Sequence, residues 1–237
     1  MEPVQVSMTL VQHIVPKEID YLAQGGITTG DVNGNFNPTK QVTRAEAAAM
    51  IGRTLDLDGT KRSTKFKDVG ASIFASGYIQ SAVEKGIISG YADGSFKPNA
   101  NVTRGEMAIM LSRAFDYDFD KSISGAAEAL KSRGIAQGMA DGSFGAGLPI
   151  TRADFAVFLA RAIDFNLRLG TPTVEFSGEK TINAQTVSVR KGPATTYVQM
   201  AVLNQNEKVT IGYTVGNWTL IKSSSGVVGF VPTAHLE

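Results

Sequence analysis

The sequence predicts a multi-domain protein in which an α-helical domain precedes a small all-β barrel. Two observations predict this division. The first 168 residues contain one helix-loop-helix pattern three times, whereas residues 181–237 alternate β-branched and polar residues between turns. A chain of 237 residues with 43% hydrophobic residues is long enough for a core in each part.

The composition excludes several functional classes. The 23 basic residues nearly balance the 22 acidic ones, so a net charge of +1 provides no field for nucleic acid. The chain has no cysteine, and its two histidines, His13 and His235, lie near opposite ends, which excludes disulfides, cysteine nucleophiles and most zinc sites. No apolar run can span a bilayer, and this chain contains no signal peptide. We therefore expect no membrane insertion, no cofactor and no metal.

The repeat is visible when the chain is compared with itself. Three blocks of the first copy, 26–30, 33–38 and 42–46, recur sixty positions later and again 48 positions after that, without gaps inside the blocks. One helical hairpin cannot bury its apolar face alone. We therefore expect the three copies to pack around a shared core.

Each copy is predicted to be a helix, a glycine-rich loop and a second helix. The first helices are expected at 16–24, 75–85 and 125–132, each ended by a glycine in C-cap position. Each second helix begins at a threonine followed three residues later by an acid, which is a capping box or its shorter-acid variant. The pairs are Thr43 with Glu46, Thr103 with Glu106, and Thr151 with Asp154.

An arginine follows each capping threonine: Arg44, Arg104 and Arg152. The helix dipole disfavours a cation there, so helix stability does not explain these residues. Arginine binds carboxylates in a bidentate fork, and unpaired N–H groups at a helix start also favour an anion. Three anion pockets are one interpretation, and salt bridges between repeats or solvated arginines are the other. A second arginine in each copy is expected to pair with an aspartate on the helix surface: Arg53 with Asp56, Arg113 with Asp116, and Arg161 with Asp164.

These motifs resemble the S-layer homology family, whose signature is Phe-x-Asp-Val, a helix, Gly-Ile-x-x-Gly, Asp-Gly-x-Phe-x-Pro and Thr-Arg-Ala-Glu. Repeat two carries nearly all of it, from 66–69 to 103–106. The first repeat has 6–9 in place of Phe-x-Asp, and the third has Ala146 for the proline and Asp154 for the glutamate. The resemblance covers residues 1–168, with repeats at about 1–56, 66–116 and 117–168.

The resemblance implies a pseudo-threefold helical domain that binds a secondary cell-wall polymer in grooves between repeats. The implied ligand is a pyruvylated amino sugar of a Gram-positive cell-wall polysaccharide. The three arginines would bind its carboxylate, three loop glycines would admit the sugar, Asp68 would hydrogen-bond it, and two glutamates complete the predicted site. The glycines are Gly30, Gly90 and Gly138, and the glutamates are Glu46 and Glu106. A positive φ in a tight turn is the alternative explanation of the glycines.

The rest of the chain is predicted to be a linker and a barrel. Residues 169–180 are short and polar, with Gly170, Pro172 and Gly178, and are expected to be a linker. Residues 181–237 are expected to form five short strands, at 187–190, 198–203, 208–212, 218–222 and 227–231.

The barrel sequence resembles the bacterial Src-homology-3 (SH3) family. The resemblance is carried by 187–194, 216–218 and 229–231, although Phe230 stands where most members have Trp. It implies either a domain that binds peptidoglycan or an inert spacer. Trp218, Tyr197 and Tyr213 would form the aromatic groove, and burial in a core is the alternative.

Three functions from different classes are compatible with the sequence. The first is a non-catalytic cell-wall anchor, extracellular and monomeric. The second is the targeting half of a wall hydrolase, such as an amidase, or of an adhesin, with its working domain outside this chain. The third is a protein–protein scaffold of a surface lattice. A calcium loop at Asp31, Asn33 and Asn35 is disfavoured because Phe36 and Val42 occupy positions that need Gly and an acid.

Overall fold

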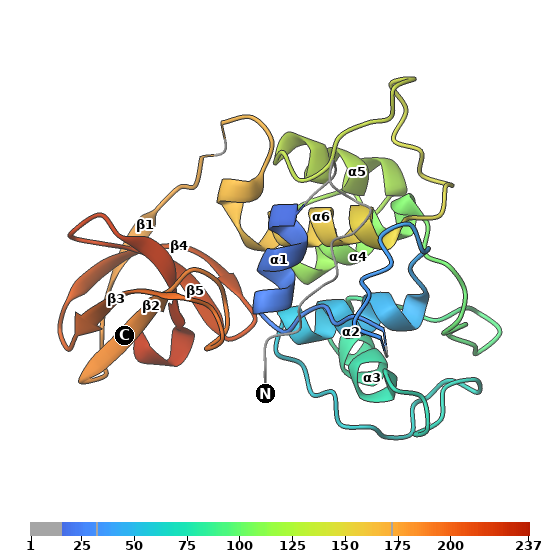
Figure 1. Cartoon of the computed structure of the whole chain (residues 1–237), viewed down its shortest axis with the longest axis horizontal. Helices are drawn as coiled ribbons and strands as arrows, with labels where there is room; N and C mark the ends of the chain where they lie inside the picture. The colour runs from blue at the N-terminus through green and yellow to red at the C-terminus, as the bar shows by residue number, and fades with distance from the viewer. Residues whose placement is uncertain (1–15, 32, 172) are drawn as a thin grey trace.

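The helices and the strands form two adjacent domains, as the computed structural model of the chain shows (Figure 1). The structure describes residues 16–31, 33–171 and 173–237. The predicted start of the first repeat, with the segment 6–9 and His13, lies outside the described residues. The predicted fold class, a helical domain followed by a β domain, is confirmed. The longest of the described helices has 12 residues, so none of them could cross a bilayer.

The first helix of each repeat begins and ends within two residues of its predicted bounds, and each second helix begins one residue after the predicted threonine. Each repeat contributes two of them, and the loop between the two contains the glycine-rich motif. In chain order they are α1 (Pro16–Gln24), α2 (Arg44–Thr54), α3 (Ser76–Glu84), α4 (Arg104–Ala114), α5 (Ile123–Ser132) and α6 (Arg152–Ile163).

The capping threonines explain why the second helices begin where they do. Helices α2 and α4 have complete capping boxes, in which the threonine accepts from the glutamate N–H and the glutamate accepts from the threonine N–H. In α6 the Thr151 hydroxyl accepts from the Asp154 N–H at 3.1 Å and bonds the Asp154 carboxylate at 2.8 Å. Asp154 is one methylene shorter than glutamate, and the reciprocal bond to the Thr151 N–H is not formed.

Helix pairs that cross the repeat boundaries close the helical domain into a ring. Helix α2 packs on α3, α4 on α5, and α6 returns to α1. Main-chain hydrogen bonds also join the three segments that directly precede the second helices. The N–H of Val42 donates to Ile150 O, that of Val102 to Val42 O, and that of Ile150 to Val102 O, at 2.9–3.0 Å. This cyclic arrangement is the pseudo-threefold organisation that the resemblance implied.

A single apolar core fills the ring. Leu22, Ile51, Leu111, Leu130 and Phe155 are at most 2% exposed and come from five of the six helices. Burial of a side chain of this size contributes about 1.5–3 kcal/mol each. The stripe predicted from the sequence is present, because Met50, Met110 and Phe158 are all buried in that cluster.

The β domain is a six-stranded antiparallel sheet in the order β1-β4-β5-β6-β2-β3. Its strands are β1 (Ser177–Thr181), β2 (Thr186–Arg190), β3 (Gln199–Asn204), β4 (Lys208–Val215), β5 (Trp218–Ser223) and β6 (Val228–Pro232). Five of them match the prediction, but β1 lies mostly in the segment predicted to be a linker. Its sequence, SGEKT, has no apolar residue, and the strand forms through main-chain pairing with β4. Hydrophobic alternation could not reveal it.

The two domains are packed against each other. Leu55, Phe115 and Phe165, which follow α2, α4 and α6, pack on the barrel cluster of Val215, Trp218, Leu220 and Phe230. Val174 and Phe176, from the predicted linker, pack on the same cluster, and the Leu169 N–H donates to Gly134 O at 2.8 Å. The predicted linker is therefore held by Val174, Phe176 and the Leu169 N–H, although most of its described residues are exposed. The barrel covers the C-terminal ends of all three second helices.

Candidate functional site

The three arginines at the starts of the second helices join one repeat to the loop of the next. Arg44 donates from Nε to Phe96 O at 2.8 Å and from Nη2 to Ser89 O at 2.7 Å. Arg104 bonds Phe144 O and Gln137 O in the same way, and Arg152 bonds Phe36 O and Thr29 O. Each guanidinium also lies over the ring of the loop phenylalanine, at 4.7–5.0 Å. These contacts explain why an arginine is tolerated at a helix start.

The main-chain N–H groups at these helix starts are not available for an anion, contrary to the sequence-based expectation. The Arg44 N–H donates to Ala100 O and the Ala45 N–H to Pro98 O, both at 2.9 Å. The next N–H, of Glu46, donates to the Thr43 hydroxyl. The other two helices repeat this pattern with their own neighbours. An anion at these sites therefore has to bind side chains.

The box glutamates bring a carboxylate close to the arginine of the preceding repeat. Arg44 Nη1 lies 3.5 Å from Glu106, and Arg152 Nη1 lies 3.6 Å from Glu46. Lys40 forms a further ion pair with Glu46 at 2.9 Å. Burial alone would raise the pKa of Glu46, but hydrogen bonds from the Thr43 N–H and from Lys40 outweigh it and hold that pKa below its ordinary value.

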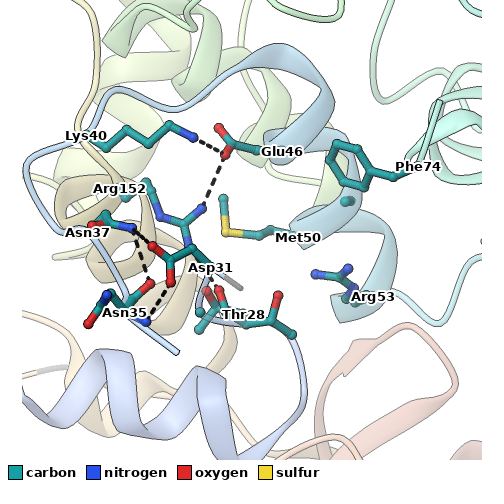
Figure 2. A pocket seen from close by; sticks show the side chains of 13 residues that line it. Thr28, Asp31, Asn35, Asn37, Lys40, Glu46, Met50, Arg53, Phe74 and Arg152 are labelled. Atoms are coloured by element: carbon teal, nitrogen blue, oxygen red, sulfur yellow. Dashed lines mark hydrogen bonds and ion pairs between the residues drawn. The ribbon is translucent and has the colours of Figure 1, made fainter. Parts of the chain in front are cut away.

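A cavity of about 220 Å³ lies where Arg152 of the third repeat meets the first repeat; we name it groove A (Figure 2). Its lining includes Gly30, Glu46 and Met50 of the first repeat. Lys40, Arg53 and Arg152 bring three positive charges to it, and Asp31 and Glu46 bring two negative charges. Figure 2 shows Phe74, from the segment before α3, at the edge of the same cavity.

A second cavity, groove B, has about 320 Å³ and lies where Arg44 of the first repeat meets the second repeat. Gly90, Glu106 and Met110 take the places of Gly30, Glu46 and Met50. Groove B is more apolar, because Tyr91 stands at the position that Asp31 has in the first repeat, and Ile123 contributes from the start of α5.

A second arginine lines each groove, and the helix-surface ion pairs predicted for these arginines are wrong. Arg53 lines groove A and donates to Ile27 O at 3.2 Å, and Arg113 lines groove B. The predicted helix-surface ion pairs with Asp56, Asp116 and Asp164 are not formed among the described residues. Both aspartates after α2 and α4 adopt a positive φ, at 58° and 52°, where the helix has already ended. The sequence signal that could have identified them as groove residues is their recurrence at the equivalent position of every repeat.

The third repeat boundary, where Arg104 of the second repeat meets the loop of the third repeat, differs from the other two. Phe158 occupies the position that Met50 and Met110 have in the other two repeats, and its ring lies 5.1 Å from the Arg104 guanidinium. The second arginine here, Arg161, is paired with Glu18 at 3.3 Å. Burial lowers the pKa of Arg104. At this boundary, aromatic packing and an internal ion pair thus involve the residues equivalent to those that line grooves A and B.

The loop glycines are needed for close packing, not for a positive φ. Gly30, Gly90 and Gly138 are absent from the residues with positive φ. A Cβ on Gly90 would overlap the Phe66 ring and lie 2.8 Å from Ser95 O, and one on Gly138 would lie 3.0 Å from Ser143 O. Gly30 and Gly90 line the two grooves, whereas Gly138 belongs to the third boundary.

Asp68 holds a loop in place. Its two carboxylate oxygens accept from the N–H groups of Phe96 and Lys97, both at 2.8 Å. It is not among the residues that line groove A or groove B. Asp31, of the disfavoured calcium loop, likewise accepts from the N–H groups of Asn33 and Asn35. Within the described residues, no group of three His, Asp or Glu side chains is placed to hold a metal ion.

The three aromatic residues predicted to form a groove on the barrel lie at the interface with the helices. Tyr197 is 1% exposed, and its ring centroid is 4.8 Å from that of Tyr21 on α1. Tyr213 donates to Ile163 O at 2.6 Å, and Trp218 is buried in the cluster shared with the helix ends. This burial is the alternative that the sequence left open, and it leaves these side chains little room to contact a ligand.

Comparison with known families agrees with the repeat and barrel assignments. The S-layer homology domain matches residues 12–48, 65–108 and 118–156, and the bacterial SH3 domain matches 185–237. The S-layer homology matches together cover half of the chain. The chain therefore belongs to the S-layer homology family and carries a bacterial SH3 domain at its C-terminal end.

Similar proteins come from several bacteria. The chain is 38% identical over 111 residues to the surface-layer 125 kDa protein of Lysinibacillus sphaericus, covering 47% of this chain and 9% of that protein. It is 33% identical over 103 residues to the cellulosome-anchoring protein of Acetivibrio thermocellus (41% and 23%), and 41% identical over 91 residues to an endoglucanase of Bacillus sp. strain KSM-635 (38% and 10%). The matched region is thus a small part of each relative. The S-layer homology match, together with the surface-layer and cellulosome-anchoring relatives, places the family at the cell surface.

Proposed function

We propose that this chain is a non-catalytic module that anchors a protein to the cell wall, binding a pyruvylated wall polysaccharide in grooves A and B. The observation that carries the proposal is the pair of cavities between successive repeats, each lined by arginines from two repeats. A pyruvate ketal carries a carboxylate, which charge-assisted bonds from such arginines would hold.

The geometry refines the role of each arginine. Arg44 and Arg152 already use Nε and Nη2 for main-chain oxygens, and Nη1 is the atom nearest the groove glutamate. Arg113 is exposed, and its side chain makes no hydrogen bond or ion pair with another described residue. The ligand carboxylate is therefore assigned chiefly to Arg53 and Arg113, with Arg44 and Arg152 as the walls of the grooves.

Each groove takes residues from all three repeats, which supports a site that needs the closed ring. Groove A combines Arg152, the first-repeat loop and Phe74, and groove B combines Arg44, the second-repeat loop and Ile123. Phe74 is 51% exposed and Ile123 is 44% exposed. Exposed apolar side chains beside charged ones suit a sugar ring, which has apolar faces and polar edges.

The test is calorimetric titration of the chain with purified pyruvylated cell-wall glycan and with the same glycan after removal of pyruvate. Loss of the carboxylate should abolish measurable binding. Arg53→Gln and Arg113→Gln should each weaken binding at its groove by roughly tenfold or more, as expected for a lost charged hydrogen bond. Lys131→Gln, which removes an exposed charge outside both grooves, should not change binding. Equal binding of the two glycans would exclude carboxylate recognition.

The parent protein could carry a catalytic domain elsewhere. The similarity to an endoglucanase and to an amylopullulanase of Thermoanaerobacterium thermosulfurigenes, each over a small share of its length, favours this second candidate. In that case the chain would keep its enzyme at the cell wall. A glycan and peptide hydrolysis assay on the protein that contains this chain would distinguish the two.

A further inference from the structure

A third cavity, of about 450 Å³, lies between the helical domain and the barrel. One wall is a stripe of α1, formed by Lys17, Asp20, Tyr21 and Gln24 at the i, i+3, i+4 and i+7 spacing of a single helix face. The other wall has Asp164 and Leu167 after α6, and Lys191 from the barrel. Its volume is within the range of about 300–1,000 Å³ of small-molecule sites, which often form between domains.

Asp164 is a buried carboxylate at this cavity. The residue is 5% exposed, and its Oδ1 accepts from the N–H and the side-chain amide of Asn166 at 3.0 and 2.9 Å. It forms no ion pair with any described Lys or Arg. Burial raises its pKa, and this effect outweighs the opposing effects of the Asn166 hydrogen bonds and of the charges on Lys191 and Arg168. Since an ionised carboxylate is costly to bury unpaired, this position favours a ligand that brings a positive charge.

The two lysines supply the opposite charge at the same cavity. Lys17 and Lys191 are exposed, and neither forms an ion pair with a described residue. They come from different domains. The chain around Lys191 is held near α1 because the Tyr21 hydroxyl lies 3.5 Å from Lys191 O and the Tyr21 ring packs against that of Tyr197 at a tilt of 40°.

We propose that this cavity binds a small zwitterion, namely a free amino acid or a free dipeptide. Its ammonium group is assigned to Asp164 and its carboxylate to Lys17 and Lys191, while Leu167 and the Tyr21 ring form the apolar side. The site exists only while the barrel is docked, because Lys191 belongs to the barrel. It is separate from grooves A and B and does not depend on the function proposed for them.

The test is calorimetric titration of the full chain at neutral pH with the dipeptide Ala-Ala, using both the L,L and the D,D form. N-acetyl-Ala-Ala, which lacks the ammonium group, and Ala-Ala-amide, which lacks the carboxylate, are the matched probes. We expect at least one of the free dipeptides to bind, and each blocked form to bind at least tenfold more weakly. Absence of heat from both free dipeptides at tens of millimolar would overturn the proposal.

Three variants distinguish binding in this cavity from nonspecific charge effects. Lys191→Gln should weaken the free dipeptide at least fivefold and leave Ala-Ala-amide unchanged. Asp164→Asn keeps the acceptor for Asn166 and should remove the preference for a free ammonium group. Lys180→Gln removes an exposed charge on β1, outside the cavity, and should leave binding unchanged. Equal losses in Lys191→Gln and Lys180→Gln would contradict the assignment.

Discussion

Replacing Arg104 by alanine should destabilise the ring without removing a residue that lines groove A or groove B. Arg104 belongs to the third repeat boundary, is 7% exposed, and donates to two main-chain oxygens of the next loop at 2.9 and 3.1 Å. Hydrogen bonds from charged groups contribute about 1.5–3 kcal/mol each. Water reaching the emptied site would offset part of this loss, so we expect the free energy of unfolding to fall by about 3 kcal/mol.

Thermal unfolding followed by circular dichroism measures this effect. For a protein of this size 1 kcal/mol corresponds to about 2–4 °C, so Tm should fall by roughly 6–12 °C. Arg113→Gln is the matched control, because the Arg113 side chain makes no hydrogen bond to a described residue, and the Tm of this variant should stay within about 2 °C of the parent. If Arg104→Ala melted as high as that control, the arginine would not be joining the repeats.

Three further predictions concern packing, docking and pH. Gly90→Ala should cost about 1–3 kcal/mol because its Cβ would overlap the Phe66 ring, whereas Gly70→Ala meets no atom within 4 Å and serves as the control in urea unfolding. Tyr213→Phe should lower stability by about 1 kcal/mol through loss of the 2.6 Å bond to Ile163 O; an unchanged Tm would mean that this interdomain bond contributes nothing. The pKa of Glu46 is lowered by folding, so its stabilising effect is complete above its unfolded pKa of about 4.3 and is lost as pH falls through the folded value. The Tm difference between the parent and Glu46→Gln should therefore shrink below about pH 4, and a constant difference would contradict this reasoning.

The sequence singled out some of the arginines that line grooves A and B and overlooked others for a definable reason. Arg44 and Arg152 were found because a cation at a helix start is locally unfavourable. Arg53 and Arg113 were overlooked because an aspartate three residues later offered a local explanation. Pairing along the helix competes with contacts across a repeat boundary, and spacing along the chain cannot decide between them.

The sequence by itself determined the repeats, the helix starts and most of the strands. These features depend on local chemistry: the Thr43 cap, the glycine after each first helix and the apolar alternation of the barrel. Only the tertiary structure decided what the arginines contact, because their partners are main-chain oxygens, which every residue carries and which no sequence pattern marks. It also decided that Tyr197, Tyr213 and Trp218 face the helical domain, because burial against another domain depends on the path of the whole chain.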